Sequence, residues 1–338
     1  MIEFNPAIGR DKPVQIKESA QPKALWRRGW VRLCVSAFTL ALLLMILPRE
    51  QLWNALRRIS PAVWGWCLVV YLCMHLIGAI KWRLTVNRAG AGIGLLQAVR
   101  CYYGGLFGNL FLPSVVGGDL VRAGLAYRDT HSRTGLVLGS LIDRVIDFVA
   151  LATVAAIGAV LLPDQLGLVS RKVILPLAVA LILGIVGIAV GWRFVSVRRL
   201  SMKMRRRMVM LRRAGRQLIS HPQFVVLSLL LGITLQSCMV LLNGWLGRAC
   251  GLECSWAVWL FVWPLAKLSA VLPITQGGVG VREAALAALF SPFGVPAAQA
   301  VAVGLVFQSI VITGALLSGP LALAAASFSN RRADSAGI

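Results

Sequence analysis

The sequence predicts an all-α integral membrane protein with about six transmembrane helices and two re-entrant helical hairpins, arranged as an inverted repeat. Three observations lead to this fold class. Hydrophobic residues make up 58% of the 338 residues and charged residues only 14%, whereas about a quarter of a soluble domain is charged. Six apolar segments each approach or exceed the roughly 18 to 20 residues that a helix needs to cross a bilayer. An eleven-residue motif occurs twice, 160 residues apart, and marks two related halves.

The six apolar segments are the expected spans. They comprise residues 30–47, 62–80, 135–162, 173–192, 224–247 and 297–326. A polar arm, residues 1–29, precedes the first segment, and no small-residue cleavage site follows Leu47. We therefore expect an uncleaved membrane anchor rather than a signal peptide.

The net charge of +23 is distributed in a way that indicates topology. Seven Lys and Arg residues precede or open the first span, and ten lie in the acid-free stretch 193–216. Such clusters remain on the cytoplasmic side of a membrane. We expect them to set the orientation and also to attract anionic lipids of the inner leaflet, at roughly 1 kcal/mol per residue near the surface. Nucleic acid is not an expected partner.

The basic cluster also determines the predicted membrane topology of the first half. The first span leaves the cytoplasm and the second returns, which places Lys81 in the cytoplasm. If segment 96–113 then crossed fully, the loop 193–221 would lie outside. Segment 96–131 is therefore predicted to enter from the cytoplasmic side and return, because Pro113 ends a helix and Gly117-Gly118 permits a sharp reversal.

The second half repeats this order in the opposite orientation. Segment 256–291 is predicted to dip from the outer face before the last span returns to the cytoplasm. Three crossings per half invert the second copy, as in many transporters. Residues 51–59 are expected to form an interfacial helix. The resulting divisions are a cytoplasmic arm 1–29, a first half 30–162, a fourth span 163–192, a basic cytoplasmic loop 193–221, the rest of the second half 222–326 and a cytoplasmic tail 327–338.

The repeated motif has the frame L-P-x-x-x-G-G-x-x-x-R and runs from Leu112 to Arg122 and from Leu272 to Arg282. Each copy follows an apolar run and precedes a polar turn. Its predicted helix-break residues are Pro113, Gly117 and Gly118 in the first copy, and Pro273, Gly277 and Gly278 in the second.

Three blocks carry a family resemblance. N-L-F-L-P-S-V-V-G-G-D-L-V-R-A at 109–123, L-I-D-R-V-I-D at 141–147 and L-P-I-T-Q-G-G-V-G-V-R-E at 272–283 resemble the signature blocks of the lysylphosphatidylglycerol synthase transmembrane-region family, also described as flippase-like integral membrane proteins. The resemblance covers about residues 30–326 and implies a role in lipid translocation. The chain ends at Ile338 without a soluble domain large enough for aminoacyl transfer, so synthesis of an aminoacylated lipid is not implied.

Arg122 and Arg282 are the main candidates for binding a substrate. A membrane-embedded arginine is unfavourable by at least a few kcal/mol unless it is paired or hydrated, and is therefore a functional candidate by default. Guanidinium binds phosphate oxygens in a fork, so we expect a lipid with an anionic headgroup. In the alternative interpretation, the arginines only neutralise nearby acids and lock the broken helices together. Further candidates for the substrate site are Asp119, Glu283, Asn109, Asp143, Arg144, Asp147 and Lys267, together with the four motif glycines Gly117, Gly118, Gly277 and Gly278, whose backbone amides could donate to a headgroup.

Other polar residues in the apolar runs are open to more than one interpretation. Asp143 and Asp147, four residues apart at the expected cytoplasmic end of a span, share a helix face; they could couple protons or pair with basic groups, and we favour pairing. His75 is expected to be a satisfied interhelical hydrogen bonder. Cys250 and Cys254 flank an expected outer loop and could form a disulfide, although we favour free thiols.

We therefore expect flippase- or scramblase-type translocation of a phospholipid or lipid-linked glycan across a bacterial inner membrane or plasma membrane, with both termini in the cytoplasm. No metal or cofactor is expected, and no nucleotide-binding or hydrolase motif is present. One alternative is a membrane enzyme, or enzyme subunit, that acts on a phosphate- or sugar-bearing lipid. Another is a scaffold for a partner that modifies lipids or glycans.

Overall fold

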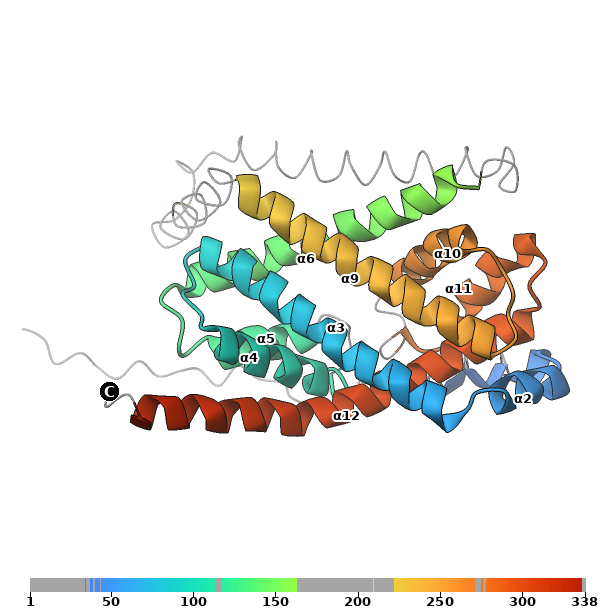
Figure 1. Cartoon of the computed structure of the whole chain (residues 1–338), viewed down its shortest axis with the longest axis horizontal. Coiled ribbons are helices and arrows are strands. Elements are labelled where there is room, and N and C mark those ends of the chain that lie inside the picture. The colour runs from blue at the N-terminus through green and yellow to red at the C-terminus, as the bar shows by residue number, and fades with distance from the viewer. Residues whose placement is uncertain are drawn as a thin grey trace, which may run out of the picture.

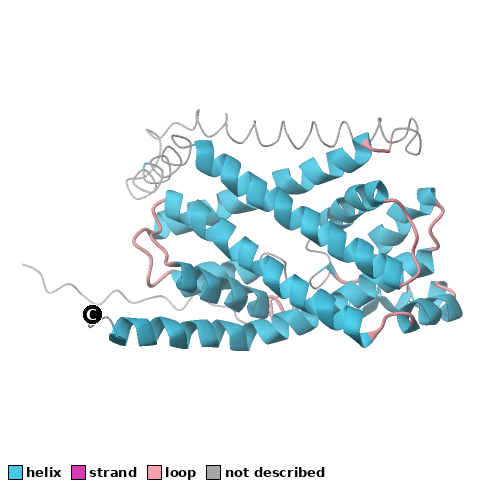
Figure 2. Cartoon of the chain, viewed as in Figure 1, coloured by secondary structure: helices cyan, strands magenta, loops and turns pink. Residues whose placement is uncertain are grey.

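The computed structural model describes, apart from isolated positions, residues 34–112, 117–162, 222–270 and 278–335. All secondary structure in these ranges is helical (Figure 2). Three helical segments are long and apolar enough to cross a membrane. They are α3 (Pro61–Arg88), α9 (Pro222–Ala249) and the part Ala297–Ala326 of α12 (Ala297–Ser335). They coincide with three predicted spans, so the all-helical membrane class is confirmed.

Of the three other predicted spans, one is a fully described helix. Helix α6 (Arg133–Val160) corresponds to the predicted span 135–162, and its 28 residues are enough to cross a bilayer. Helix α6 carries Asp143, Arg144 and Asp147 in its middle turns, whereas the charged residues of α3 lie toward its C-terminal end. The span 30–47 is described only in part, and its described residues are helical as far as Ile46. The span 173–192 lies outside the described residues, as do the arm 1–29 and almost all of the loop 193–221.

Short polar caps fix where several helices begin. Ser60 accepts a hydrogen bond from the backbone N–H of Val63 at 3.2 Å, and Pro61 occupies the first position of α3. Ser132 caps α6 by accepting from the N–H of Gly135 at 3.0 Å. These caps satisfy backbone donors that have no partner at a helix start.

The two predicted hairpins each consist of two short helices with a break between them. The first contains α4 (Leu95–Gly108) and α5 (Gly117–Ala126), and the second contains α10 (Trp256–Ser269) and α11 (Val281–Phe290). A 3-10 turn, η3 (Ser291–Phe293), follows α11.

Helix lengths repeat between the halves. Helices α3 and α9 both have 28 residues, α4 and α10 both have 14, and α5 and α11 both have 10. Helix α9 begins at Pro222, 161 residues after Pro61 opens α3. The correspondence therefore extends well beyond the eleven-residue motif.

The corresponding helices α3 and α9 run in opposite directions (Figure 1). Helix α3 runs from lower right to upper left in this view, whereas α9 runs from upper left to lower right. Hairpin α4–α5 lies toward the left end of the molecule, and α10–α11 lies toward the right end. Each hairpin also packs on the last long helix of the other half, since α4 contacts α12 and α10 contacts α6.

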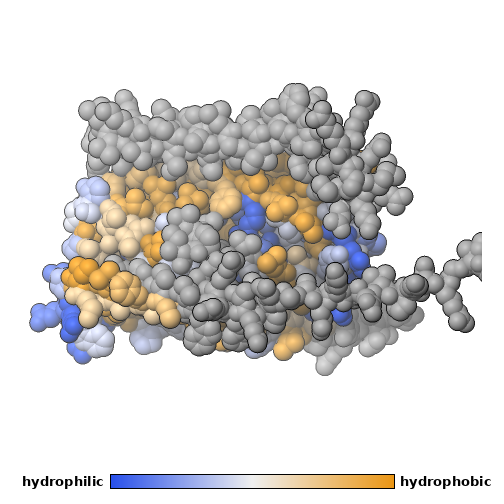
Figure 3. Space-filling model, turned by 180° about the vertical axis from the view of Figure 1, so that it is seen from behind, coloured by the Kyte–Doolittle hydropathy of each residue, from blue (hydrophilic) through white to orange (hydrophobic). Residues whose placement is uncertain are grey.

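Apolar side chains form both the core and much of the described surface. One large buried cluster joins α3, α9, α10, α11 and α12, and includes Trp259, Trp263 and Phe290. Figure 3 shows blue, hydrophilic residues at both ends of the long axis, orange, apolar residues between them and one blue patch near the middle. A short helix, α2 (Arg49–Arg57), occupies most of the predicted interfacial segment 51–59.

Candidate functional site

Lys81 lies at the centre of an ion cluster that joins α3 to α6. Its ammonium group forms an ion pair with Asp143 and lies 3.0 Å from Oδ1 of Asp147, the latter without hydrogen-bond geometry. Lys81 is only 1% exposed. The sequence placed Lys81 just beyond the second span, whereas the structure has it within α3, which continues to Arg88. The two aspartates of α6 allow its charge to be buried there.

Arg122 on α5 joins this cluster from the first hairpin. Its Nη2 is 3.1 Å from Oδ1 of Asp119 and 3.4 Å from Oδ2 of Asp143. The guanidinium also lies over the rings of Trp82 at 4.6 Å and Tyr102 at 5.0 Å. Arg122 is 5% exposed and its Nε has no hydrogen-bond partner among the described residues. Cation–π contact and two carboxylates thus hold a mostly desolvated charge in place.

Arg144 completes a chain of charges that alternate in sign. Its Nε donates to Oδ2 of Asp119, so that one carboxylate is shared by Arg144 and Arg122. The sequence of contacts is Asp147, Lys81, Asp143, Arg122, Asp119 and Arg144. Three cations and three carboxylates cancel, so this chain is formally neutral.

Asp143 was expected at the end of a span and paired with basic groups, and the structure agrees with the second expectation but not the first. Asp143 is 1% exposed and lies well inside α6, not at the end of a span. Both Asp143 and Asp147 contact Lys81, which favours the pairing interpretation over a free carboxylate pair.

The second half builds a smaller site around Arg282. Its Nη2 contacts Oε1 of Glu283 at 2.6 Å, Oε1 of Gln308 at 2.8 Å and the carbonyl oxygen of Gly304 at 3.4 Å. The other carboxylate oxygen of Glu283 accepts the N–H of Gly280 at 2.6 Å, which caps α11. Arg282 is 6% exposed. Each repeated arginine is therefore buried and paired with an acid of its own hairpin, although the acids occupy different motif positions.

Lys267 on α10, which is partly buried, differs from the buried basic residues. Its Nζ donates to Oε1 of Gln236 on α9 at 2.8 Å. Within the described parts of the chain, no carboxylate is at ion-pair distance from it. His75 on α3 is 8% exposed, and neither ring nitrogen has a hydrogen-bond partner there. The expectation that His75 is a satisfied hydrogen bonder is therefore wrong.

The glycines of the two motif copies have different roles. Gly117 and Gly118 form the first turn of α5 rather than a reversal, and a Cβ on Gly118 would lie 2.5 Å from the side chain of Asn109. Asn109 accepts the N–H of Gly118 at 2.6 Å and thus joins the two hairpin helices. Gly278, in contrast, has a φ of 78°, as the predicted break requires. Pro113, Pro273 and Gly277 lie outside the described residues.

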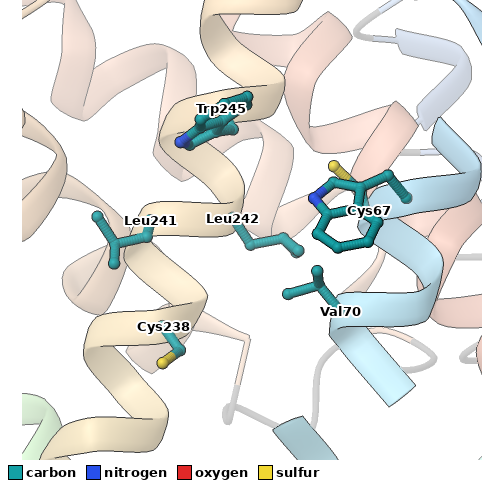
Figure 4. A pocket seen from close by; sticks show the side chains of 7 residues that line it. Cys67, Val70, Cys238, Leu241, Leu242 and Trp245 are labelled. Atoms are coloured by element: carbon teal, nitrogen blue, oxygen red, sulfur yellow. The ribbon is translucent and has the colours of Figure 1, made fainter. Parts of the chain in front are cut away.

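A cavity of about 180 Å³ lies between α3 and α9. Figure 4 shows Cys67 and Val70 of α3 facing Cys238, Leu242 and neighbouring residues of α9. Its complete lining is Trp66, Cys67, Val70, Cys238, Leu241, Leu242 and Trp245. No charged side chain lines it, so this cavity can contact apolar chains but cannot hold an ion.

Several site residues were not identified from the sequence. Lys81, Gln236, Gln308 and Trp82 all belong to the ion or hydrogen-bond networks. Gln236 and Gln308 could have been recognised as polar residues inside apolar runs. For Lys81, the spacing could have indicated a buried position. Gly78, Lys81, Trp82 and Thr85 share one face of α3, and all four are buried.

The comparison with family models agrees with the fold and with the repeated motif. The model of the lysylphosphatidylglycerol synthase TM region matches residues 29–319. No curated protein and no solved structure matches the chain. The matched region contains both hairpins, both buried arginines and the Lys81 ion cluster. Because the match extends over far more than half of the sequence, the chain belongs to the lysylphosphatidylglycerol synthase TM region family.

Proposed function

We propose that the protein translocates, in the manner of a flippase or scramblase, a phospholipid or lipid-linked glycan with an anionic headgroup across the cytoplasmic membrane. The observation that carries this proposal is the pair of buried arginines. Arg122 and Arg282 each lie on the second helix of a broken hairpin, one in each half. Guanidinium groups in a dry site bind phosphate oxygens strongly and in a fixed orientation.

We also propose that the two halves form an inverted repeat. Three features support it: matching helix lengths, the antiparallel directions of α3 and α9, and the exchange in which α4 packs on α12 and α10 on α6. In this arrangement hairpin 96–131 enters from the cytoplasm and hairpin 256–291 from outside. Transporters with this plan bind substrate near the midplane, where broken helices from the two halves meet.

The proposed location is the cell membrane, with several crossings and both termini in the cytoplasm. The end of α3, the start of α9 and the end of α12 all lie at the left end of the molecule in Figure 1. Residue 222 directly follows the acid-free basic loop 193–221, and such loops remain cytoplasmic. The basic loop would also contact anionic lipids of the inner leaflet.

The state of the carboxylates favours translocation over the enzymatic alternative. Asp119, Asp143 and Glu283 are each paired with at least one cation of the protein itself. These residues therefore hold the arginines and Lys81 in place. A lipid- or glycan-modifying enzyme would then act as a separate partner that supplies or receives the lipid.

The test uses purified protein in vesicles with phosphatidylglycerol labelled on its headgroup. We expect the headgroup to become accessible on the opposite leaflet without a covalent change, as followed by mass spectrometry of the recovered lipid. Arg122→Gln and Arg282→Gln should each slow this movement, whereas Arg128→Gln, at an exposed position of the same hairpin, should not. Formation of a new lipid product would instead support the enzymatic alternative. Movement equal to that of protein-free vesicles would refute translocation of this lipid.

A further inference from the structure

A group of hydrogen-bond donors, two of them buried and one partly buried, lies outside the ion pairs of the two arginine sites. It comprises His75 on α3 with Trp263 and Lys267 on α10, and is called the donor cluster below. Trp263 and Lys267 are four residues apart and therefore project from one face of α10. Trp263 is 1% exposed, and its indole nitrogen has no hydrogen-bond partner among the described residues, as is also true of both ring nitrogens of His75.

Ring contacts place the donor cluster between the two arginines. On one side, the ring centroids of His75 and Tyr102 are 5.8 Å apart, and Tyr102 in turn lies under the guanidinium of Arg122. On the other side, the ring centroids of Trp263 and Phe307 are 4.9 Å apart, and the guanidinium of Arg282 is 5.1 Å from the centre of the Phe307 ring.

Tyr71 connects the two sides. Its ring centroid is 4.5 Å from that of His75 and 6.1 Å from that of Phe307. The donor cluster is thus continuous with both arginine sites through packed aromatic rings. Residues from both halves of the chain contribute to it, because His75 belongs to the first half and Trp263 to the second.

The chemistry of the donor cluster is one-sided. An indole nitrogen can only donate, an ammonium group has three protons and no lone pair, and a neutral imidazole donates from one nitrogen. Among the described residues, Lys267 donates one hydrogen bond, to the amide oxygen of Gln236 at 2.8 Å, and the carboxylate of Asp147 acts on it electrostatically without forming an ion pair. The chain of six charges around Lys81 is neutral, and Arg282 has Glu283. The positive charge of Lys267 is therefore not balanced by a directly paired carboxylate.

We propose that His75, Trp263 and Lys267 form an anion subsite that holds a phosphate group between the Arg122 and Arg282 sites. A phosphate supplies several acceptor oxygens for these donors and a negative charge that can pair with Lys267. The inference rests on the proposed function, because a lipid headgroup that moves between the two arginines passes through this position. Free inorganic phosphate has the same chemistry and is the other source that the experiment distinguishes.

The test measures binding rather than transport. Radiolabelled phosphatidylglycerol and, separately, inorganic phosphate are titrated against the full-length protein in detergent, with diacylglycerol as a lipid that has no phosphate. Lys267→Met should weaken phosphatidylglycerol binding about tenfold, and Trp263→Phe, which keeps the ring but removes the N–H, by about threefold or more. Lys267→Arg should retain most of the affinity. Diacylglycerol binding should not change.

Trp259→Phe is the matched control. Trp259 is a buried tryptophan on the same helix that packs on Phe290 with a centroid distance of 4.8 Å, and its nitrogen is not among the unpartnered buried atoms. It should bind both probes as wild type does. Equal weakening by Trp259→Phe and Trp263→Phe would overturn the subsite, since it would show a general packing effect.

Three further outcomes distinguish this inference, its lipid assignment and the proposed function from one another. If Lys267→Met and Trp263→Phe bind phosphatidylglycerol as wild type while Arg122→Gln abolishes its movement, the subsite is refuted and translocation stands. If the two variants lose only inorganic phosphate binding, the lipid assignment of the subsite is refuted. If the wild-type protein moves no lipid but both variants bind phosphatidylglycerol more weakly than it does, the subsite stands and the proposed function fails.

Discussion

Asp119 and Arg122, three residues apart on α5, form an ion pair in which Oδ1 and Nη2 are 3.1 Å apart, with Arg122 buried and Asp119 partly buried. The same carboxylate also accepts from Arg144 on α6. This pair therefore fixes the first hairpin to a long helix and at the same time orients a guanidinium that could bind a headgroup. Variants of the two residues distinguish these roles.

The first prediction compares single and double variants of this pair. Arg122→Gln should slow movement of labelled phosphatidylglycerol, and Arg122→Lys should restore it only in part because the fork geometry is lost. The double variant Arg122→Gln, Asp119→Asn should remain slow if Arg122 binds the headgroup. Flux in vesicles and the yield of folded protein are the two measurements. Full recovery of transport in the double variant would leave only the structural role.

The second prediction concerns the charge of Lys81. In Lys81→Met, Asp143 and Asp147 lose the cation between them, and breaking a buried pair of this kind is unfavourable by about 3–5 kcal/mol. We expect a lower unfolding temperature in detergent and a lower yield. Arg100→Met, at an exposed position of α4, is the matched control and should unfold as wild type does. An unchanged unfolding temperature for Lys81→Met would show that Lys81 does not hold α3 to α6.

The third prediction tests the close approach of α4 to α5. A Cβ on Gly105 would lie 2.7 Å from the carbonyl oxygen of Gly118 and 3.1 Å from Cβ of Arg122. Gly105→Ala should therefore displace Arg122 and reduce transport. Gly124→Ala on α5 has no heavy atom within 4 Å and should be neutral or favour the helix by up to about 1 kcal/mol. Wild-type flux in Gly105→Ala would contradict the packing argument.

The fourth prediction separates backbone strain from packing at the second break. Gly278 has a φ of 78°, and its Cβ would lie 2.5 Å from that of Ala270. Gly294 has a similar φ of 73° in open space. Alanine at either site should be unfavourable by about 1–2 kcal/mol from the left-handed backbone, but only Gly278→Ala should also stop transport. Equal transport by the two variants would mean that the packing at Gly278 is not required.

The fifth prediction is topological. Glu253 is exposed in the loop between α9 and α10, whereas burial raises the pKa of the neighbouring Cys254 thiol to about 11. Cys250 and Cys254 are both free thiols. A membrane-impermeant maleimide should label Glu253→Cys from outside at neutral pH, and Ser201→Cys in the basic loop only from the cytoplasm. Native Cys254 should label slowly and faster as the pH rises toward its pKa, because the thiolate is the reactive form. Labelling of Ser201→Cys from outside would contradict the proposed orientation.

Sequence alone was sufficient for the class of the protein and for much of its helix plan. Hydropathy located α3, α9 and α12 to within a few residues at most boundaries, and the repeated motif located both hairpins. The predicted and observed elements agree because a backbone in an apolar environment must satisfy its own hydrogen bonds, which leaves the helix as the available form. Arg122 and Arg282 were also recognisable from sequence, since arginine is rare in such surroundings.

Only the tertiary structure decided which charges belong together. Hydropathy ended the second span at residue 80 and left Lys81 beyond it, whereas Lys81 is buried within α3 and pairs with Asp143, 62 residues further along the chain. The positions of His75 and Trp263 as unpartnered donors likewise depend on neighbours from several helices. Hydropathy along the sequence reflects the free energy of transferring single residues into an apolar phase. The energy of a buried charge depends instead on partners that only the packed fold brings within a few ångströms.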